Sequence, residues 1–336
     1  MTTKVTTDWH IGVKRLGGTT LESQQALMQY LRDSLQAQLD DCDHLIAGDL
    51  LDCFTIDTSE LIATYNIFSS WLSKYQRKLA IMRGNHDFHM SALKMSSFDL
   101  LAHILKYQFP EQVTVANDVT KWKQFILVPH LPNNDILLDA IQNLQDIEGH
   151  VIVFHANVDN IHAAESEHSL NISIEQIKDL VSRGNSVLVG HEHKSRSLLG
   201  GKCIVIGNTA PSSISDCIGD PFKNAIRVEG NHIEVVPTWD HLDSYVEVDW
   251  RDLDDIGQWQ FIRVTGTASA QEAADVIKAV SKLRQSSQAF VIGNAVKVAG
   301  SELVNSVESI KAFDVLGAIY AELNDEEKEC VKGLLC

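Results

Sequence analysis

Five short motifs in this chain combine acidic, histidine and asparagine side chains with glycine, and each follows an apolar segment. Carboxylate, amide and imidazole groups suit manganese, iron or zinc, and the motifs hold no cysteine for a softer metal. Glycines before Asp49, Asn85 and His191 permit tight turns that can aim these side chains at one point. The motifs are Asp8-Trp9-His10, Gly48-Asp49-Leu50-Leu51-Asp52, Gly84-Asn85-His86-Asp87, Phe154-His155-Ala156-Asn157 and Gly190-His191-Glu192-His193.

These motifs offer more ligands than one metal ion needs. A tetrahedral ion takes four ligands, whereas two ions that share a bridging carboxylate take the whole set. Two ions about 3.5–4 Å apart can activate a water and hold a phosphate for in-line displacement. The sequence therefore predicts a two-metal centre that hydrolyses phosphate esters. The expected ligands are Asp8, His10, Asp49, Asn85, His155, His191 and His193.

The segments that must position these residues alternate between strand and helix patterns. The last four motifs each follow a short run rich in Val, Ile and Leu, which is typical of a buried strand. The segment before the first motif, residues 4–7, has fewer large aliphatic side chains, so weak or edge-like pairing is expected there. The predicted strands are 44–47, 78–82, 125–128, 150–154, 186–189 and 202–206, and the predicted helices are 20–39, 59–75, 97–107 and 173–182.

This alternation predicts an α/β domain with a layered sheet. Ligands bind outside the carboxyl ends of the strands in an open α/β sheet, so the five motifs are expected to meet at one rim. The chain after residue 240 follows another pattern, with a strand at 261–265, a helix at 270–283 and a strand pair or one bent strand at 289–298. The predicted domains are 1–240, an α+β module at 241–300, and C-terminal helices at 301–336, placed at 309–323 and 326–335.

Composition limits the classes of protein that fit. The chain has 336 residues, of which 44% are hydrophobic, and no apolar run of about 18 residues predicts a membrane span. No signal peptide pattern opens the sequence, so a cytoplasmic location is expected, which is the host cytoplasm for a phage protein. Six scattered cysteines form no C-x-x-C pair and are expected to be reduced. The net charge of −17 argues against bulk electrostatic binding of nucleic acid.

The order of the motifs resembles the calcineurin-like metallophosphoesterase superfamily. Residues 8–12, Asp-Trp-His-Ile-Gly, and residues 207–211, Gly-Asn-Thr-Ala-Pro, resemble SbcD-type subunits of DNA double-strand-break repair nucleases, in bacterial or phage form. The resemblance implies a four-layer α/β/β/α sandwich with a small α+β capping domain and C-terminal helices. Its motifs cover residues 8–211, whereas the tail matches only in layout.

The resemblance also implies a role for each candidate residue. Asp49 would bridge the two metals, and His86 would contact the phosphate and protonate the leaving oxygen. Asp87 would orient His86 or, equally, start a helix. His89 is a candidate by position alone, because it lies just past the third motif, where it would contact substrate or occupy a surface helix position. One metal would be held by Asp8, His10 and His193, and the other by Asn85, His155 and His191.

The leading functional expectation is a manganese-dependent DNA nuclease, with double-strand exonuclease and single-strand endonuclease activity. Magnesium, iron or zinc are the alternative metals. The expected partners are DNA, an SbcC-like coiled-coil ATPase and a second copy of this chain. The apolar stripe of residues 309–323 would dock on the ATPase or pack on its own domain. Two alternatives are a nucleotide or cyclic-nucleotide phosphodiesterase or phosphatase, which the acidic charge favours, and a non-catalytic scaffold, which the intact ligand set argues against.

Overall fold

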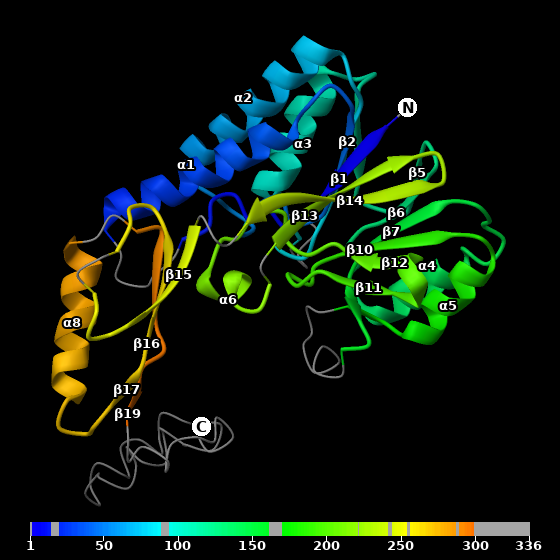
Figure 1. The fold of residues 1–336 in the computed structure, drawn as a ribbon. Coiled ribbons are helices and arrows are strands. Elements are labelled where there is room, and N and C mark those ends of the chain that lie inside the picture. The colour runs from blue at the N-terminus through cyan, green and yellow to red at the C-terminus, as the bar shows by residue number, and fades with distance from the viewer. Residues whose placement is uncertain are drawn as a thin grey trace, which may run out of the picture.

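The structure is a computed structural model with a mixed α/β fold (Figure 1). It describes residues 2–14, 20–88, 94–160, 170–220, 222–240, 244–253, 256–286 and 289–298. His89 and the predicted C-terminal helices at 301–336 lie outside these residues. Within the described ranges, no helix has both the length and the apolar character that a membrane crossing requires.

The first sheet has six strands, and β1 lies inside it rather than at an edge. β1 pairs in parallel with β2 and antiparallel with β13, and all four of its residues are buried. The expectation of weak or edge-like pairing for this segment was wrong. β-Branched threonines suit a strand, and Lys4 is neutralised by Asp40 at 2.6 Å. The strand order is β14 (His232–Asp240), β13 (Phe222–Glu229), β1 (Thr3–Thr6), β2 (Asp43–Ala47), β3 (Leu79–Met82) and β4 (Val113–Ala116).

The second sheet also has six strands. Its four inner strands run parallel, and the edge strands β11 and β5 pair antiparallel with their neighbours. In the central pair of strands, Gly190 lies opposite His155, so two of the predicted motifs begin side by side. The order is β11 (Arg196–Leu198), β12 (Cys203–Val205), β10 (Ser186–Gly190), β7 (Val151–His155), β6 (Phe125–Val128) and β5 (Thr120–Trp122).

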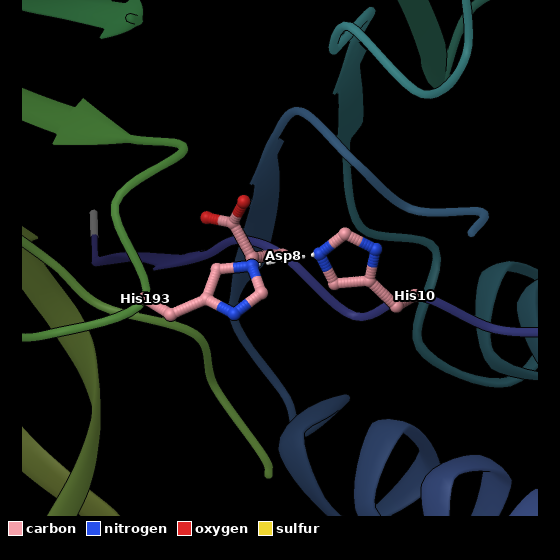
Figure 2. A group of neighbouring side chains, drawn as sticks. All are labelled: Asp8, His10 and His193. Atoms are coloured by element: carbon pink, nitrogen blue, oxygen red, sulfur yellow. Dashed lines mark hydrogen bonds between the residues drawn. The ribbon is translucent and has the colours of Figure 1, made fainter. Parts of the chain in front are cut away.

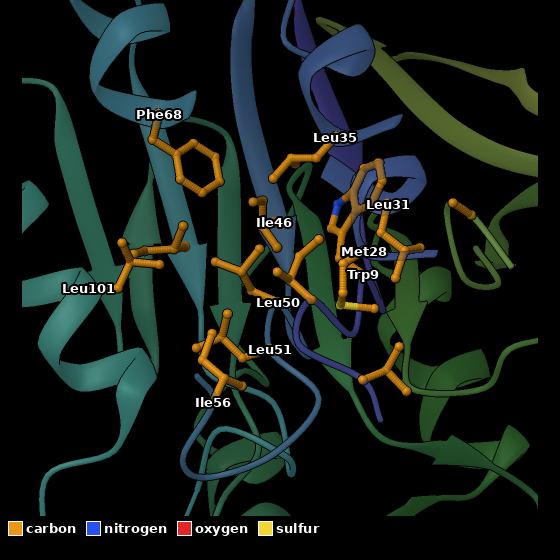
Figure 3. Close-up of a cluster of buried hydrophobic side chains, with 14 of the residues drawn as sticks. Trp9, Met28, Leu31, Leu35, Ile46, Leu50, Leu51, Ile56, Phe68 and Leu101 are labelled. Carbon is orange, nitrogen blue, oxygen red and sulfur yellow. The ribbon is translucent and has the colours of Figure 1, made fainter. Parts of the chain in front are cut away.

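Apolar side chains fill the space between the sheets and cover their outer faces. Val5 and Leu45 of the first sheet share one core with Val153 and Leu188 of the second. A core on the other face of the first sheet, which includes Trp9, joins that sheet to α1 (Leu21–Gln38), α2 (Thr58–Tyr75) and α3 (Ser97–Gln108) (Figure 3). A further core packs α4 (Asn134–Gln142) and α5 (Ile174–Ser182) on the second sheet. Each fully buried Leu or Phe contributes about 1.5–3 kcal/mol.

Helices α1, α3 and α5 begin where polar side chains satisfy free backbone N–H groups. The Thr20 hydroxyl accepts from the Ser23 amide at the start of α1. Capping boxes of Ser96 with Asp99 and of Ser173 with Gln176 begin α3 and α5. The predicted starts of these three helices at 20, 97 and 173 are therefore confirmed to within one residue.

The chain after β14 forms a smaller sheet with one helix. β15 (Tyr245–Asp249), β16 (Phe261–Thr265) and β18 (Val291–Asn294) run parallel, and α8 (Ala273–Ser286) packs on them. A strand pair or one bent strand was predicted at 289–298. The structure has two strands there, β18 and β19 (Lys297–Val298), which pair with β16 and β17 (Thr267–Ala268) rather than with each other. Phe290 stacks on Tyr30 of α1, with ring centroids 4.9 Å apart, so this module packs against the first sheet's helices. The remaining short elements are β8 (Asn157–Val158), β9 (Asn171–Ile172), a 3-10 turn (Leu199–Gly201) and α6 (Ile214–Cys217).

Candidate metal centre

The predicted ligands lie at the carboxyl ends of five strands from both sheets. Asp8, Asp49 and Asn85 follow β1, β2 and β3, while His155 ends β7 and His191 follows β10. All five strands are parallel to their neighbours in this series, so their ends meet at one rim. The two sheets pack face to face through a common core, which brings the two groups of strand ends together.

Asp8, His10 and His193 form the first cluster, with ligand atoms within 4.8 Å of one another. Nε2 of His10 and Nε2 of His193 face each other at 3.0 Å (Figure 2). Imidazole nitrogen is a ligand for manganese, iron and zinc, so these two rings could hold one ion together. Oδ1 of Asp8 is buried and has no hydrogen-bond partner among the described residues, as expected of an atom reserved for a cation.

Asn85, His155 and His191 form the second cluster. Oδ1 of Asn85 lies 3.0 Å from Nε2 of His155 and 2.8 Å from Nδ1 of His191. Nδ1 of His155 must donate its proton to the Ala47 carbonyl at 2.9 Å, so the neutral ring presents a lone pair at Nε2. That lone pair faces a carboxylate oxygen of Asp49 at 3.3 Å. Acceptor atoms that converge in this way attract a cation, which is either a proton or a metal ion.

Asp49 lies between the two clusters. Its carboxylate lies within 4.8 Å of ligand atoms of His10 and His86, and within the same distance of ligand atoms of His155 and His191. Oδ1 also accepts a hydrogen bond from the His86 amide at 3.0 Å, which fixes the orientation of the carboxylate. Asp49 was predicted to bridge two metals. Among the described residues, it belongs both to a ligand group with His10 and to the ligand group with His155 and His191.

The electrostatics of the rim favour positive charge. Burial opposes ionisation of Asp49, but the nearby His155 outweighs burial and holds the pKa of the carboxyl well below its usual range. Burial likewise opposes protonation of His155, but Asp49 raises its pKa to about 9. For His191, burial and the charge of His155 lower the pKa to about 4. A divalent cation would take the place of the proton that this site otherwise attracts.

Four of the predicted ligands have left-handed backbone conformations. The φ angles are 53° at Asp8, 48° at His10, 47° at Asp49 and 90° at His191. Such conformations at non-glycine residues cost about 1–3 kcal/mol each and cluster at functional sites. Because these residues are not glycines, their motifs gave no sign of this strain. This strain indicates that the backbone at the rim adopts the conformation that directs the ligand side chains, at some cost in stability.

The glycines of the motifs act mainly by making space. Gly48 has φ = 98°, and a Cβ there would collide with the His155 ring. A Cβ at Gly84 would collide with the Asp49 carboxylate. Gly84 does not have a positive φ, so the turn-forming role expected for every motif glycine applies to Gly48 and not to Gly84. Close approach of strand ends is the reason for glycine at position 84.

A comparison with known families agrees with this geometry. The model of the calcineurin-like phosphoesterase family matches residues 1–195, which is more than half of the chain. The chain belongs to this family. The phosphoesterase therefore hydrolyses phosphate esters with divalent metals, and its Asp and His clusters are able to hold them. No curated protein matched the chain in a sequence comparison.

His86 of the phosphoesterase lies beside the clusters with part of its ring in solvent. Its side chain is 40% exposed, and Nε2 is 4.0 Å from Asp49. Nδ1 contacts the carbonyl oxygen of Asp52, which can only accept, so Nδ1 carries a proton. This contact fixes the orientation of the His86 ring.

Asp87 turns away from His86. Its carboxylate is buried and accepts from the Gly84 amide at 2.9 Å and the Leu51 amide at 3.4 Å. Burial and the negative charge of Asp49 raise its pKa to about 7. No contact joins Asp87 to His86 in the described part of the chain, so the backbone of Asp52 takes the orienting role expected for Asp87. Asp87 instead connects the second and third motifs.

The sequence did not single out Asp216, whose Oδ1 lies 2.8 Å from Nδ1 of His193. Burial opposes charge on both groups, but their hydrogen bond outweighs it, raising the pKa of His193 and lowering that of Asp216. The available signal was the pattern Ser213-x-x-Asp216, which predicts the start of a helix. It predicts α6 and gives no indication that the carboxylate reaches a residue 23 positions earlier.

Proposed function

We propose that this phosphoesterase is a manganese-dependent DNA nuclease, with double-strand exonuclease and single-strand endonuclease activity. The proposal is carried by residues 8–12 and 207–211, which resemble SbcD-type nucleases and lie side by side. The Thr7 amide donates to Oγ1 of Thr209 at 2.9 Å, and the Thr209 amide donates to the Thr7 carbonyl at 3.1 Å. Thr7 directly precedes the first segment, so the second segment is hydrogen-bonded to the chain next to Asp8.

In this proposal the first and second clusters each hold one metal, and Asp49 bridges them. Manganese fits the mixed oxygen and nitrogen donors, as do magnesium, iron and zinc to different degrees. When bound, the metals supply an activated water and neutralise the charge of the phosphate. His86 gives a proton to the leaving oxygen, a contribution of about 10²–10⁴ in rate.

The exposure of the centre supports a polymeric substrate. The His86 side chain is 40% exposed and that of His193 is 34% exposed. Small-molecule sites usually bury about 70–90% of their ligand. Because His86 and His193 are both partly exposed, the centre suits a phosphodiester within a DNA strand that lies across the surface.

The charge of −17 requires help in holding DNA. An SbcC-like coiled-coil ATPase would supply the basic surface that this chain lacks, as in a nuclease complex for DNA repair or recombination. We also propose a homodimer, because α3 exposes an apolar stripe at helical spacing. Leu100 and Ile104 are each 38% exposed, and Tyr107 is 84% exposed.

We interpret the fold in the same terms. The helices packed outside each sheet and the core between the sheets support a four-layer α/β/β/α sandwich. The sheet of β15, β16 and β18 with α8 supports an α+β capping domain within residues 241–300. Cytoplasmic location and docking of the ATPase on residues 301–336 complete the proposal.

The deciding experiment is cleavage of linear duplex and single-stranded DNA with manganese, by the protein alone and with an SbcC-like ATPase encoded beside its gene. We expect cleavage that disappears in the His86→Asn variant, which controls for a contaminating nuclease. DNA left intact under both conditions, by a protein that hydrolyses bis-p-nitrophenyl phosphate, would overturn the nuclease proposal while leaving the family assignment in place.

A nucleotide or cyclic-nucleotide phosphodiesterase or phosphatase is the second candidate, and the acidic charge favours it. The same preparation should be assayed with nucleoside monophosphates and cyclic nucleotides. Turnover of these compounds far above that of DNA ends would favour the second candidate. The matched His86→Asn variant again shows whether the activity belongs to this centre.

A further inference from the structure

His193 is held by a segment that lies beyond the part of the chain matched by the family. We call residues 207–220 and 222–223 the clasp. Asp216 contacts the His193 ring at 2.8 Å, and the amine of Lys223 donates to the His193 carbonyl at 3.1 Å. The Asn208 amide donates to the same carbonyl at 3.3 Å. Both the ring and the backbone of His193 are therefore fixed from the clasp.

The Asp216 carboxylate is itself fixed in place. Its side chain is 3% exposed, and Oδ2 accepts from the Ser212 amide at 2.9 Å and the Ser212 hydroxyl at 3.2 Å. Its own amide donates to the Ser213 hydroxyl in the first turn of α6. Because one oxygen is tied to Ser212, the other is aimed at His193 and cannot rotate away without breaking these bonds.

Lys223 is a fully buried amine on β13. Its side chain has no exposure, and it pairs with Asp220 at 2.8 Å in addition to its bond to His193. Burying a charged amine is costly unless it is paired and hydrogen-bonded. Both conditions are met by contacts within the clasp and to His193. The clasp is thus joined to His193 at Asp216 and at Lys223, and Lys223 lies on a strand of the first sheet.

These contacts determine which nitrogen of His193 is available. A carboxylate can only accept, so the neutral ring carries its proton on Nδ1 and presents a lone pair on Nε2. Nε2 is the atom that lies 3.0 Å from Nε2 of His10 in the first cluster. We propose that Asp216 is a positioning residue that fixes the tautomer and direction of His193, and that the clasp thereby completes the first metal site. The inference rests on the metal chemistry of the family and does not depend on DNA as the substrate.

The test is manganese binding to Asp216→Asn, measured by calorimetry on metal-free protein. Partners behind a metal-binding histidine typically change metal affinity by about 10–100-fold. We expect one of two manganese ions to bind that much more weakly and the other to bind as in the wild type. Asp216→Glu should recover part of the loss. Asp179→Asn, which removes an exposed carboxylate paired with Arg183, is the matched control and should bind both ions normally.

A folded Asp216→Asn protein that binds both ions with wild-type affinity would overturn the proposal. A second measurement does not depend on the folding of the Asp216 variants. Nitrogen-15 NMR of the metal-free wild type, recorded at a pH at which the His193 ring is neutral and with its signals assigned from His193→Gln, should show the proton on Nδ1. A neutral His193 protonated on Nε2 would equally overturn it. Neither measurement involves DNA, so a failure here is distinguishable from failure of the proposed nuclease activity.

Discussion

The two clusters of the rim are built from similar residues but are held in different ways. In the second cluster, Nδ1 of His155 donates to the main-chain carbonyl of Ala47, inside the core between two sheets. In the first cluster, Nδ1 of His193 contacts a carboxylate on a short helix. The His155 side chain is fully buried, whereas that of His193 is 34% exposed.

The second cluster is therefore oriented by the two sheets, whereas the first cluster is oriented by the clasp. Ala47 ends β2 and His155 ends β7, so the bond that orients His155 forms when the two sheets pack together. The first cluster needs Asp216, which lies outside residues 1–195. We therefore expect perturbations to separate the clusters, except where they act on Asp49.

The largest effect is expected for Asp49→Asn, which removes the carboxylate that both clusters share. The variant should lose affinity for both metals, and hydrolysis of bis-p-nitrophenyl phosphate should fall by at least about 10³, because metal charge stabilisation is worth several kcal/mol. Calorimetry with manganese and the hydrolysis assay measure the two effects. Loss of one metal only would show that Asp49 belongs to a single cluster.

His86→Asn should reduce hydrolysis by about 10²–10⁴ and leave both metals bound. His86 contacts neither cluster through a hydrogen bond from its ring, whose Nδ1 is committed to Asp52. Metal binding by calorimetry and turnover at saturating metal are the measurements. Unchanged turnover would remove His86 from proton transfer, and a lost metal would assign His86 to the first cluster instead.

Acid stability should depend on a histidine outside both clusters. His44 on β2 is fully buried, and burial lowers its pKa to about 3. The unfolded chain binds this proton below a pH of about 6.5 and the folded chain does not, so stability present above that pH is lost as pH falls toward 3. Compared with His44→Gln, the metal-free wild type should lose up to about 1.4 kcal/mol more per pH unit. Urea unfolding across this window tests it, and parallel curves for the two proteins would contradict it.

The smallest expected effect comes from replacing glycines. It distinguishes the cost of a steric clash with His155 from the cost of an unfavourable backbone conformation. Gly48 and Gly184 both have positive φ, at 98° and 80°, but only a Cβ at Gly48 meets the His155 ring, while Gly184 faces open space. Gly184→Ala should cost about 1–2 kcal/mol through its backbone alone. Gly48→Ala should cost about 1–3 kcal/mol more and weaken only the metal of the second cluster.

Urea unfolding and manganese titration of the two glycine variants measure these differences. Equal loss of stability in both variants would show that the His155 ring moves away from the new Cβ at no cost. Packing in the core would then not fix the position of His155. Weakening of the first cluster's metal by Gly48→Ala would contradict the separation of the two clusters.

Local patterns account for much of the fold. Short continuous apolar runs predicted β2, β3, β6, β7, β10 and β12, because a strand buried on both faces needs such residues wherever it lies. Caps at Thr20, Ser96 and Ser173 mark helix starts for a reason that involves only the next three residues. The placement of motifs after strands then predicted the rim without any tertiary contact.

The same local reasoning misjudged β1. Residues 4–7 offer few aliphatic side chains, yet β1 is internal because β13, more than 200 residues later, pairs along its free edge. The pattern of a segment cannot show which distant strand will cover it. For the same reason, nothing near Asp87 indicated that its carboxylate would turn to Leu51 instead of His86.

The sequence by itself determined the ligand types, their order and the strand ends that carry them, because these depend on neighbouring residues. Only the tertiary structure decided how each ligand is held: the Ala47 carbonyl behind His155, the Asp216 carboxylate behind His193, and the strained backbone at Asp49. Such partners are 23 or 108 positions from the ligand they orient. The packing of two sheets brings them together, and packing is a property of the whole chain rather than of any segment.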